Sequence, residues 1–102
     1  MDREYLDGVL WRLATDADYW PEGWDDVEVA DFRLLVQCAR AAQAEVDLRN
    51  MRILRLRPDD DSPDAARARI GANREIMLRF KGSDGRAAVT LELLTIRPKA
   101  RR

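Results

Sequence analysis

Two segments near the end of the chain alternate apolar and polar residues on either side of a glycine-rich turn. Between residues 74 and 81, and again between residues 86 and 97, apolar side chains recur at every second position. This period places them on one face of a β-strand. The intervening Gly82-Ser83-Asp84-Gly85 has the residue types of a tight hairpin turn. The pattern predicts a C-terminal β-hairpin, which needs further strands or a helix against it to be stable.

Two segments before this hairpin have the apolar spacing of amphipathic helices. From about residue 2 to residue 17, apolar residues recur three and four positions apart. Pro21 follows and prevents this helix from continuing. A second helix begins near Val27, where Asp25 or Asp26 can act as the N-cap. The apolar faces of both helices predict that they pack on the sheet.

The segment between the second helix and the hairpin has two interpretations. Residues 51–57 form a third strand if Asn50 ends the helix in the left-handed conformation, or else they continue the helix. We favour the strand, because a sheet of two strands is marginal. Residues 62–70 are predicted to form a short helix, since Ser62-Pro63-Asp64 has the residue types of a helix start and Gly71 can end it.

Together these elements predict an α+β fold in one compact domain, residues 1–102. Two N-terminal helices pack on a small, mainly antiparallel sheet of two or three strands that ends in the C-terminal hairpin. Residues 97–102 form a basic tail.

Charge is sorted along the chain, although the total net charge is only −1. Residues 1–31 hold ten acids and two bases, whereas residues 67–102 hold ten bases and three acids. Such polarity can stabilise a monomer, drive head-to-tail pairing in a homodimer, or present a basic face to a polyanion.

The composition argues against most catalytic chemistry. The chain has no histidine, which removes the commonest general base and transition-metal ligand. Cys38 is the single cysteine and has no neighbouring base in the sequence, so we expect an inert thiol in a reducing, cytoplasmic setting. We therefore predict a protein that is not an enzyme and needs neither cofactor nor metal. The strong preference for arginine over lysine is typical of GC-rich bacterial or phage genomes.

Aromatic and apolar residues supply the candidate partner-binding surface. Trp11 lies off the apolar stripe of the first helix, and Trp20 and Trp24 follow it in the acidic third. Large aromatics often anchor interfaces; the alternative for Trp20 and Trp24 is a lid over the core. Leu94 and Ile96 crowd the last strand, which is either an interface or a central strand covered within the chain.

Arginine and lysine in the last third suggest a second function class, because guanidinium groups bind phosphates well. No nucleic-acid-binding motif accompanies them. The leading interpretation is thus a protein-binding module, such as an inhibitor, an immunity-type protein or an assembly factor, and the alternative is a nucleic-acid accessory protein. The candidate phosphate contacts are Arg79, Lys81, Arg86, Arg97, Lys99, Arg101 and Arg102.

Overall fold

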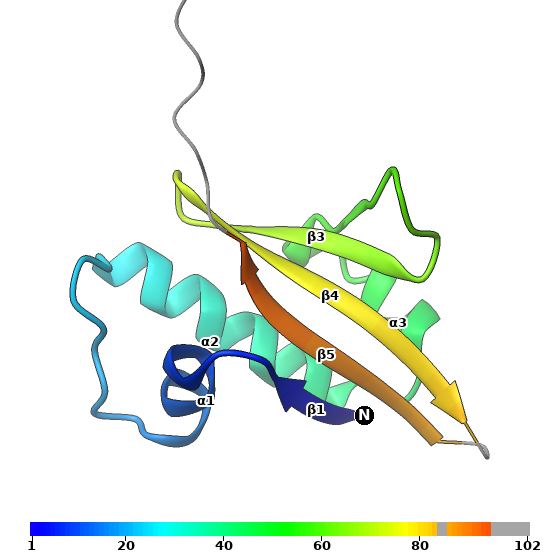
Figure 1. The fold of residues 1–102 in the computed structure, drawn as a ribbon, viewed down its shortest axis with the longest axis horizontal. Helices are drawn as coiled ribbons and strands as arrows, with labels where there is room; N and C mark the ends of the chain where they lie inside the picture. Colours follow the sequence, from blue (N-terminus) through cyan, green and yellow to red (C-terminus); the bar gives the residue numbers. More distant parts are fainter. Residues whose placement is uncertain (84–85, 95–102) are drawn as a thin grey trace, which may run out of the picture.

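The protein folds into a mixed five-stranded sheet with helices packed on one of its faces (Figure 1). The structure is a computed structural model that describes residues 1–83 and 86–94. It confirms the α+β class, but these residues contain three α-helices and five strands, where we expected two or three strands. The elements are β1 (Asp2–Tyr5), α1 (Gly8–Thr15), α2 (Asp26–Ala41), α3 (Glu45–Arg49), the 3-10 turn η1 (Arg52–Leu54), β2 (Arg57–Pro58), β3 (Ala65–Ile70), β4 (Arg74–Ser83) and β5 (Arg86–Leu94).

The strand order is β1-β5-β4-β3-β2. Strands β2 to β5 form an antiparallel meander, in which each strand lies beside its neighbour in sequence. β1 joins the opposite edge and runs parallel to β5, with Tyr5 opposite Leu91. The strand β5 is therefore central, with a neighbour on both of its edges (Figure 1).

The predicted C-terminal hairpin is present as β4 and β5. Phe80 lies opposite Val89 and Leu78 lies opposite Leu91, and all four side chains are buried. The side chains of these residues share the covered face, because residues two apart along a strand point to the same side. Residues 84–85 of the turn and residues 95–102 lie outside the described part of the chain.

The predicted helix over residues 2–17 is wrong in its first turn and a half. Residues 2–5 form β1, and the helix α1 begins only at Gly8. The backbone N–H of Leu6 donates to the carbonyl of Leu91 at 3.0 Å, which extends the contact between β1 and β5. The pairing with a strand far away in sequence decides the conformation here, and helical spacing does not reveal it.

The predicted N-cap of the second helix is confirmed at Asp25. Its carboxylate accepts a hydrogen bond from the backbone N–H of Glu28 at 2.8 Å, and the Glu28 carboxylate accepts one from the Asp25 N–H, also at 2.8 Å. This reciprocal capping box satisfies two N–H groups that the first helical turn leaves free. The helix ends at Ala41, and a short helix α3 follows instead of a continuous one.

Residues 51–57 follow neither of the two interpretations. Arg52–Leu54 form the 3-10 turn η1, and only Arg57 and Pro58 pair as a strand. Asn50 is right-handed, whereas Arg55 has a left-handed backbone with φ of 50°.

The predicted helix at residues 62–70 is wrong, since Ala65–Ile70 form the strand β3. Ala and Arg favour helices when they are isolated. Here the pairing with β4 outweighs that preference, with Ala68 opposite Ile76 and Ile70 opposite Arg74. Gly71, which we expected to end a helix, follows the strand instead and has a positive φ of 60°.

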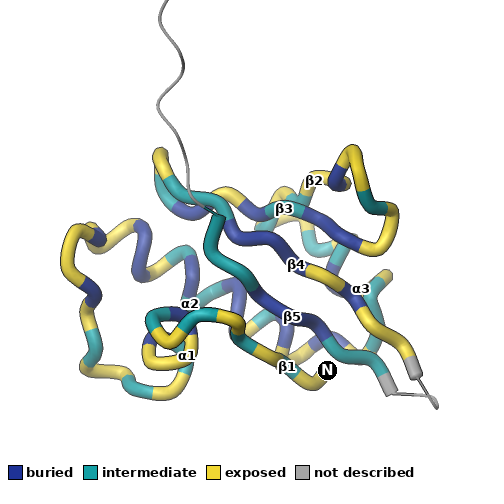
Figure 2. Tube along the Cα trace, viewed as in Figure 1, coloured by how far each residue is buried: buried dark blue, intermediate teal, exposed yellow. Residues whose placement is uncertain are grey.

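The core lies between the helices and the covered face of the sheet. Figure 2 shows buried segments along α2, β3, β4 and β5, whereas the loops are largely exposed. None of the helices that the structure describes has the length and apolar character needed to cross a membrane. The largest fully buried side chains are Phe32, Leu10, Leu13, Leu35, Leu48, Ile70, Ile76, Leu78, Leu91 and Val89.

Candidate functional site

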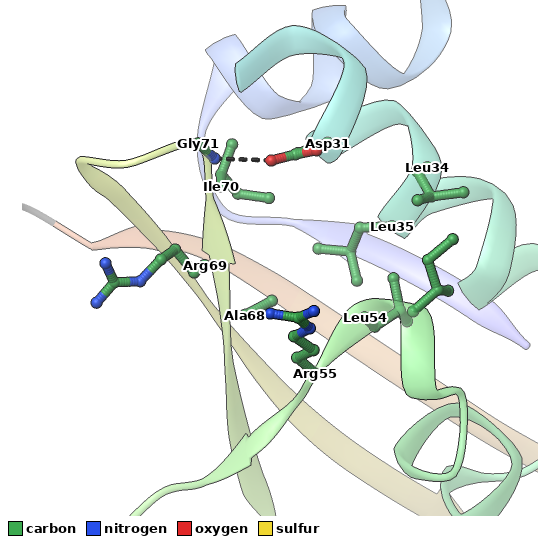
Figure 3. A pocket seen from close by; sticks show the side chains of 10 residues that line it. Asp31, Leu34, Leu35, Leu54, Arg55, Ala68, Arg69, Ile70 and Gly71 are labelled. Atoms are coloured by element: carbon green, nitrogen blue, oxygen red, sulfur yellow. Dashed lines mark hydrogen bonds between the residues drawn. The ribbon is translucent and has the colours of Figure 1, made fainter. Parts of the chain in front are cut away.

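A groove of about 220 Å³ lies between α2, η1 and the last residues of β3 (Figure 3). Six of its ten lining residues are apolar, and the charged residues Asp31, Arg55 and Arg69 line it as well. The groove therefore offers apolar contact area next to the backbone of a strand. Its apolar lining comes from Leu34, Leu35, Ile53, Leu54, Ala68 and Ile70.

β2 covers only part of the β3 edge beside this groove. Arg57 lies opposite Arg67, and Pro58 lies opposite Ala66. Within the described residues, no strand pairs with residues 68–70 on that side. The last three residues of β3 therefore present an unpaired strand edge, to which another chain can add.

Arg69 is the residue whose backbone groups face this open edge. In an antiparallel sheet, successive residues direct N–H and C=O toward opposite neighbouring strands. The carbonyl of Ala65 accepts from Asp59 on the β2 side at 3.1 Å, whereas the carbonyl of Asp64 accepts from Phe80 of β4 at 2.8 Å. Residues two apart in a strand direct their backbone groups to the same side. Arg69 is four residues after Ala65, so its N–H and C=O also point to the β2 side.

The left-handed backbone of Arg55 explains why β2 stops short. Extending the pairing of Arg57 with Arg67 by two residues would bring Arg55 opposite Arg69. Instead, Arg55 has φ of 50°, and the 3-10 turn η1 precedes it. A non-glycine residue in this region costs roughly 1–3 kcal/mol, and such strain is often found at binding sites. The chain thus turns away and leaves the β3 edge open.

Asp31 closes the other end of the open edge. Its carboxylate accepts a hydrogen bond from the backbone N–H of Gly71 at 2.8 Å, drawn as the dashed line in Figure 3. This contact fixes the end of β3 against α2. The edge is therefore bounded by Asp31 on one side and by β2 on the other.

Two arginines at the groove form no ion pair within the described residues, namely Arg55 and Arg69. Arg55 extends into the groove, whereas Arg69 extends from β3 on the side away from α2 (Figure 3). Glu75 lies opposite Arg69 on β4 but binds Arg57 and Arg67 instead. The groove is consequently bordered by two positive charges that lack a partner there.

Elsewhere on the uncovered face of the sheet, other charges do pair with each other. Lys81 Nζ lies 3.0 Å from Glu4 Oε1, and Arg79 Nε lies 3.8 Å from Glu92 Oε1. Two of the candidate phosphate contacts thus have acidic neighbours. The other candidates are the Arg86 side chain and residues Arg97, Lys99, Arg101 and Arg102, which lie outside the described part of the chain.

The predicted aromatic surface separates into residues with different environments. Trp24 is only 6% exposed and packs edge-on against Phe32, so the lid interpretation is confirmed for it. Trp20 is 54% exposed, although its indole N–H donates to the carbonyl of Trp24 at 2.8 Å. Trp11 is 56% exposed on α1. None of these side chains lines the groove.

The last-strand candidates are likewise away from the groove. Leu94 is half-buried and lies opposite Glu75 in the β4–β5 ladder. Ile96 is outside the described residues. Cys38 is half-buried, and this burial raises the pKa of its thiol, which disfavours the reactive thiolate.

Asp59 joins the loop after β2 to β3. Arg67 Nε donates to Asp59 Oδ1 at 2.9 Å, and the N–H of Asp61 donates to the other oxygen at 3.2 Å. The hydrogen bond with Arg67 is the main cause of a lowered pKa at Asp59, and burial of the carboxylate opposes it. The folded state thus favours the ionised carboxylate.

We expect the Asp59→Asn variant to lose part of the acid dependence of stability. The stabilisation from the carboxylate is complete above the unfolded pKa of about 3.9, and it disappears as the pH falls through the lower folded pKa. The variant should therefore be less stable than the parent near neutral pH, with a difference that shrinks in acid. Urea unfolding over a pH series measures this, with the exposed Asp60→Asn as control. A difference independent of pH would contradict the linkage.

The groove residues were not among the sequence-based candidates. One signal for them was present, because Ala66, Ala68 and Ile70 alternate with Arg67 and Arg69 as in a half-buried strand. No signal indicated the left-handed Arg55, since glycine and asparagine are the residues typical of that conformation.

Comparison of the chain with protein-family models, curated proteins and solved structures gives no match. What the site can bind is therefore inferred from its geometry. In the described residues, no three His, Cys, Asp or Glu side chains are grouped so that they could hold a metal ion. What the groove provides is a pair of backbone hydrogen-bonding groups, apolar contact area and positive charge.

Proposed function

We propose that this protein is a non-enzymatic protein-binding module that uses the groove between α2, η1 and β3. The unpaired β3 edge beside an apolar groove is the observation that carries the proposal. A strand added to a sheet edge gains main-chain hydrogen bonds, and the adjoining groove selects side chains. The protein then acts by surface complementarity, as an inhibitor, an immunity-type protein or an assembly factor does.

The size of the groove favours a protein segment over a small molecule. At about 220 Å³ it is smaller than the roughly 300–1,000 Å³ of pockets that enclose small ligands. It also runs along a backbone edge. A peptide uses both features, because its side chains enter the groove while its main chain pairs with the strand.

Two further expectations remain beside this proposal. Trp11 and Trp20 are exposed enough to contact a partner at a second surface. A homodimer also remains a prediction, although Lys81 with Glu4 and Arg74 with Glu28 already pair opposite charges within one chain. Light scattering at low and high salt tests the dimer, which should weaken as salt screens the charges.

Blocking the groove should remove partner binding. Ile53 is 67% exposed at the groove, so Ile53→Glu introduces a charge there without disturbing the core. We expect at least tenfold less recovery of the partner, about 1.4 kcal/mol of binding free energy. The measurement is affinity capture from cells of the host organism, followed by quantitative mass spectrometry.

The matched control is Val46→Glu, which places the same charge at a residue that is 58% exposed on α3, outside the groove. Recovery by this variant should equal that of the parent protein. If Ile53→Glu and the parent recover the same proteins in equal amounts, the groove is not the binding surface.

A further inference from the structure

We infer that the partner presents an extended segment with the pattern apolar–acidic–apolar, which pairs antiparallel with β3 opposite Arg69. The inference rests on the proposed function and names the chemistry of its partner. Three features of the groove carry it: the free backbone groups of one residue, the alternation of side chains along an added strand, and the positive charge on both sides of the edge.

The backbone limits how many residues of the partner segment can pair with the edge of β3. The N–H and C=O of Arg69 point to the open edge, while Gly71 binds Asp31 and Arg67 lies opposite Arg57. An antiparallel strand exchanges two hydrogen bonds with a residue in this position. One residue of the partner therefore sits directly opposite Arg69, and its two neighbours complete the contact.

Alternation along the added strand sets where its side chains go. Arg69 extends onto the uncovered face of the sheet, away from α2 (Figure 3). A partner residue opposite it has its side chain on that same face, close to the guanidinium group. The residues before and after it point to the other face, which is the groove lined by Leu34, Leu35 and Leu54. Two apolar side chains thus flank a residue that meets Arg69.

The charges select an acidic residue at the central position. Arg69 forms no ion pair within the described residues, because Glu75 opposite it is bound by Arg57 and Arg67. Arg55 adds a second positive charge at the groove. A carboxylate opposite Arg69 gains a charge-assisted contact, whereas a lysine there meets like charge directly across the pair, which destabilises a sheet.

Synthetic peptides test this pattern directly. The probe is a fluorescein-labelled, acetylated peptide with Val-Glu-Val at its centre and Gly-Ser flanks, titrated to millimolar concentration by fluorescence anisotropy. It should bind at least tenfold more tightly than the matched Val-Lys-Val peptide. N-methylation of the glutamate nitrogen removes one of the two hydrogen bonds and should weaken binding severalfold. In NMR spectra, the amide of Arg69 should shift on binding.

Charge reversal at Arg69 should reverse the preference for the glutamate peptide over the lysine peptide. The Arg69→Glu variant, altered at an exposed residue, should bind the lysine peptide more tightly than the glutamate peptide. Arg79→Glu is the matched control, because Arg79 is exposed on the same face but lies on β4, away from the groove. It should leave the preference unchanged. The Arg69→Ala variant, which should bind the glutamate peptide with a smaller preference than the parent does, tests the effect without a new charge.

The outcomes distinguish this inference from the proposed function. Equal binding of both peptides to the parent protein, no binding at all, or a preference that Arg69→Glu does not change would each overturn the acidic-strand inference. If capture of the partner still depends on Ile53, the groove remains the binding surface for a segment of other chemistry. If capture does not depend on Ile53, the proposed function fails.

Discussion

Replacing Gly71 with alanine should lower the free energy of unfolding by about 2–6 kcal/mol. Gly71 has φ of 60°, where a residue with a Cβ costs roughly 1–3 kcal/mol. A Cβ there would also lie 2.6 Å from Cγ of Glu28. The Glu28 side chain has little freedom to move, because it is held by Asp25 and Arg74. Overpacking of this kind costs about 1–3 kcal/mol more.

Urea unfolding followed by tryptophan fluorescence measures this loss. Gly8→Ala is the matched control, since a Cβ there meets nothing within 4 Å and the residue lies in the first turn of α1. That change should raise the stability by at most about 0.5 kcal/mol, because glycine disfavours a helix relative to alanine but Gly8 is only its first residue. Equal effects of both substitutions would show that the contact between Gly71 and Glu28 is unimportant.

The Glu28→Gln substitution should cost about 2–3 kcal/mol of stability. Glu28 is 5% exposed, and its two oxygens accept hydrogen bonds from the Asp25 N–H at 2.8 Å and from Arg74 Nε at 2.9 Å. Glutamine offers only one acceptor oxygen, so its NH₂ group faces one of these donors. Leaving a buried donor without a partner costs about 1–3 kcal/mol, and the half-buried Arg74 also loses its counterion.

The loss at Glu28 should also loosen the segment before α2. Arg74 donates to the carbonyl of Gly23 at 2.8 Å, and its guanidinium lies 4.6 Å from the ring centre of Trp24. A changed tryptophan fluorescence of the folded state is therefore expected along with lower stability. Glu92→Gln, in the exposed pair with Arg79, is the control and should alter stability by less than about 0.5 kcal/mol. A similar loss in both variants would contradict the importance of burial.

The parts of the fold that local signals decide could be predicted from the sequence. The helix α2 begins with a capping box at Asp25 and Glu28, whose residue types mark a helix start by themselves. The β4–β5 hairpin combines alternation with a glycine-rich turn. In both cases neighbours in sequence supply the contacts that stabilise the element.

Strands that depend on distant partners could not be predicted in this way. β1 has four residues and forms through its parallel pairing with β5. Residues 65–70 consist of Ala and Arg apart from Ile70, a composition that favours a helix until β4 is beside it. Sequence spacing alone did not show which long-range pairing would outweigh these preferences.

The groove depends on where a strand pairing stops, which explains why it was missed. Arg55 adopts the left-handed conformation without the glycine that usually announces it. The three tryptophans were candidates because of their residue type. In the structure Trp11 and Trp20 are exposed, whereas Trp24 is buried. The position of the groove could be recognised only from the register of β2 against β3.

The neighbouring positions of β1 and β5 have a consequence for synthesis on the ribosome. Glu4 and Thr90, which are hydrogen-bonded in the sheet, are 86 residues apart. A ribosome adds roughly 5–20 residues per second, so α1 and α2 emerge several seconds before the strands that cover them. During that interval their apolar stripes have no sheet to pack against. The nascent chain therefore needs protection from aggregation until β5 emerges, and closing this long loop should limit the rate of folding.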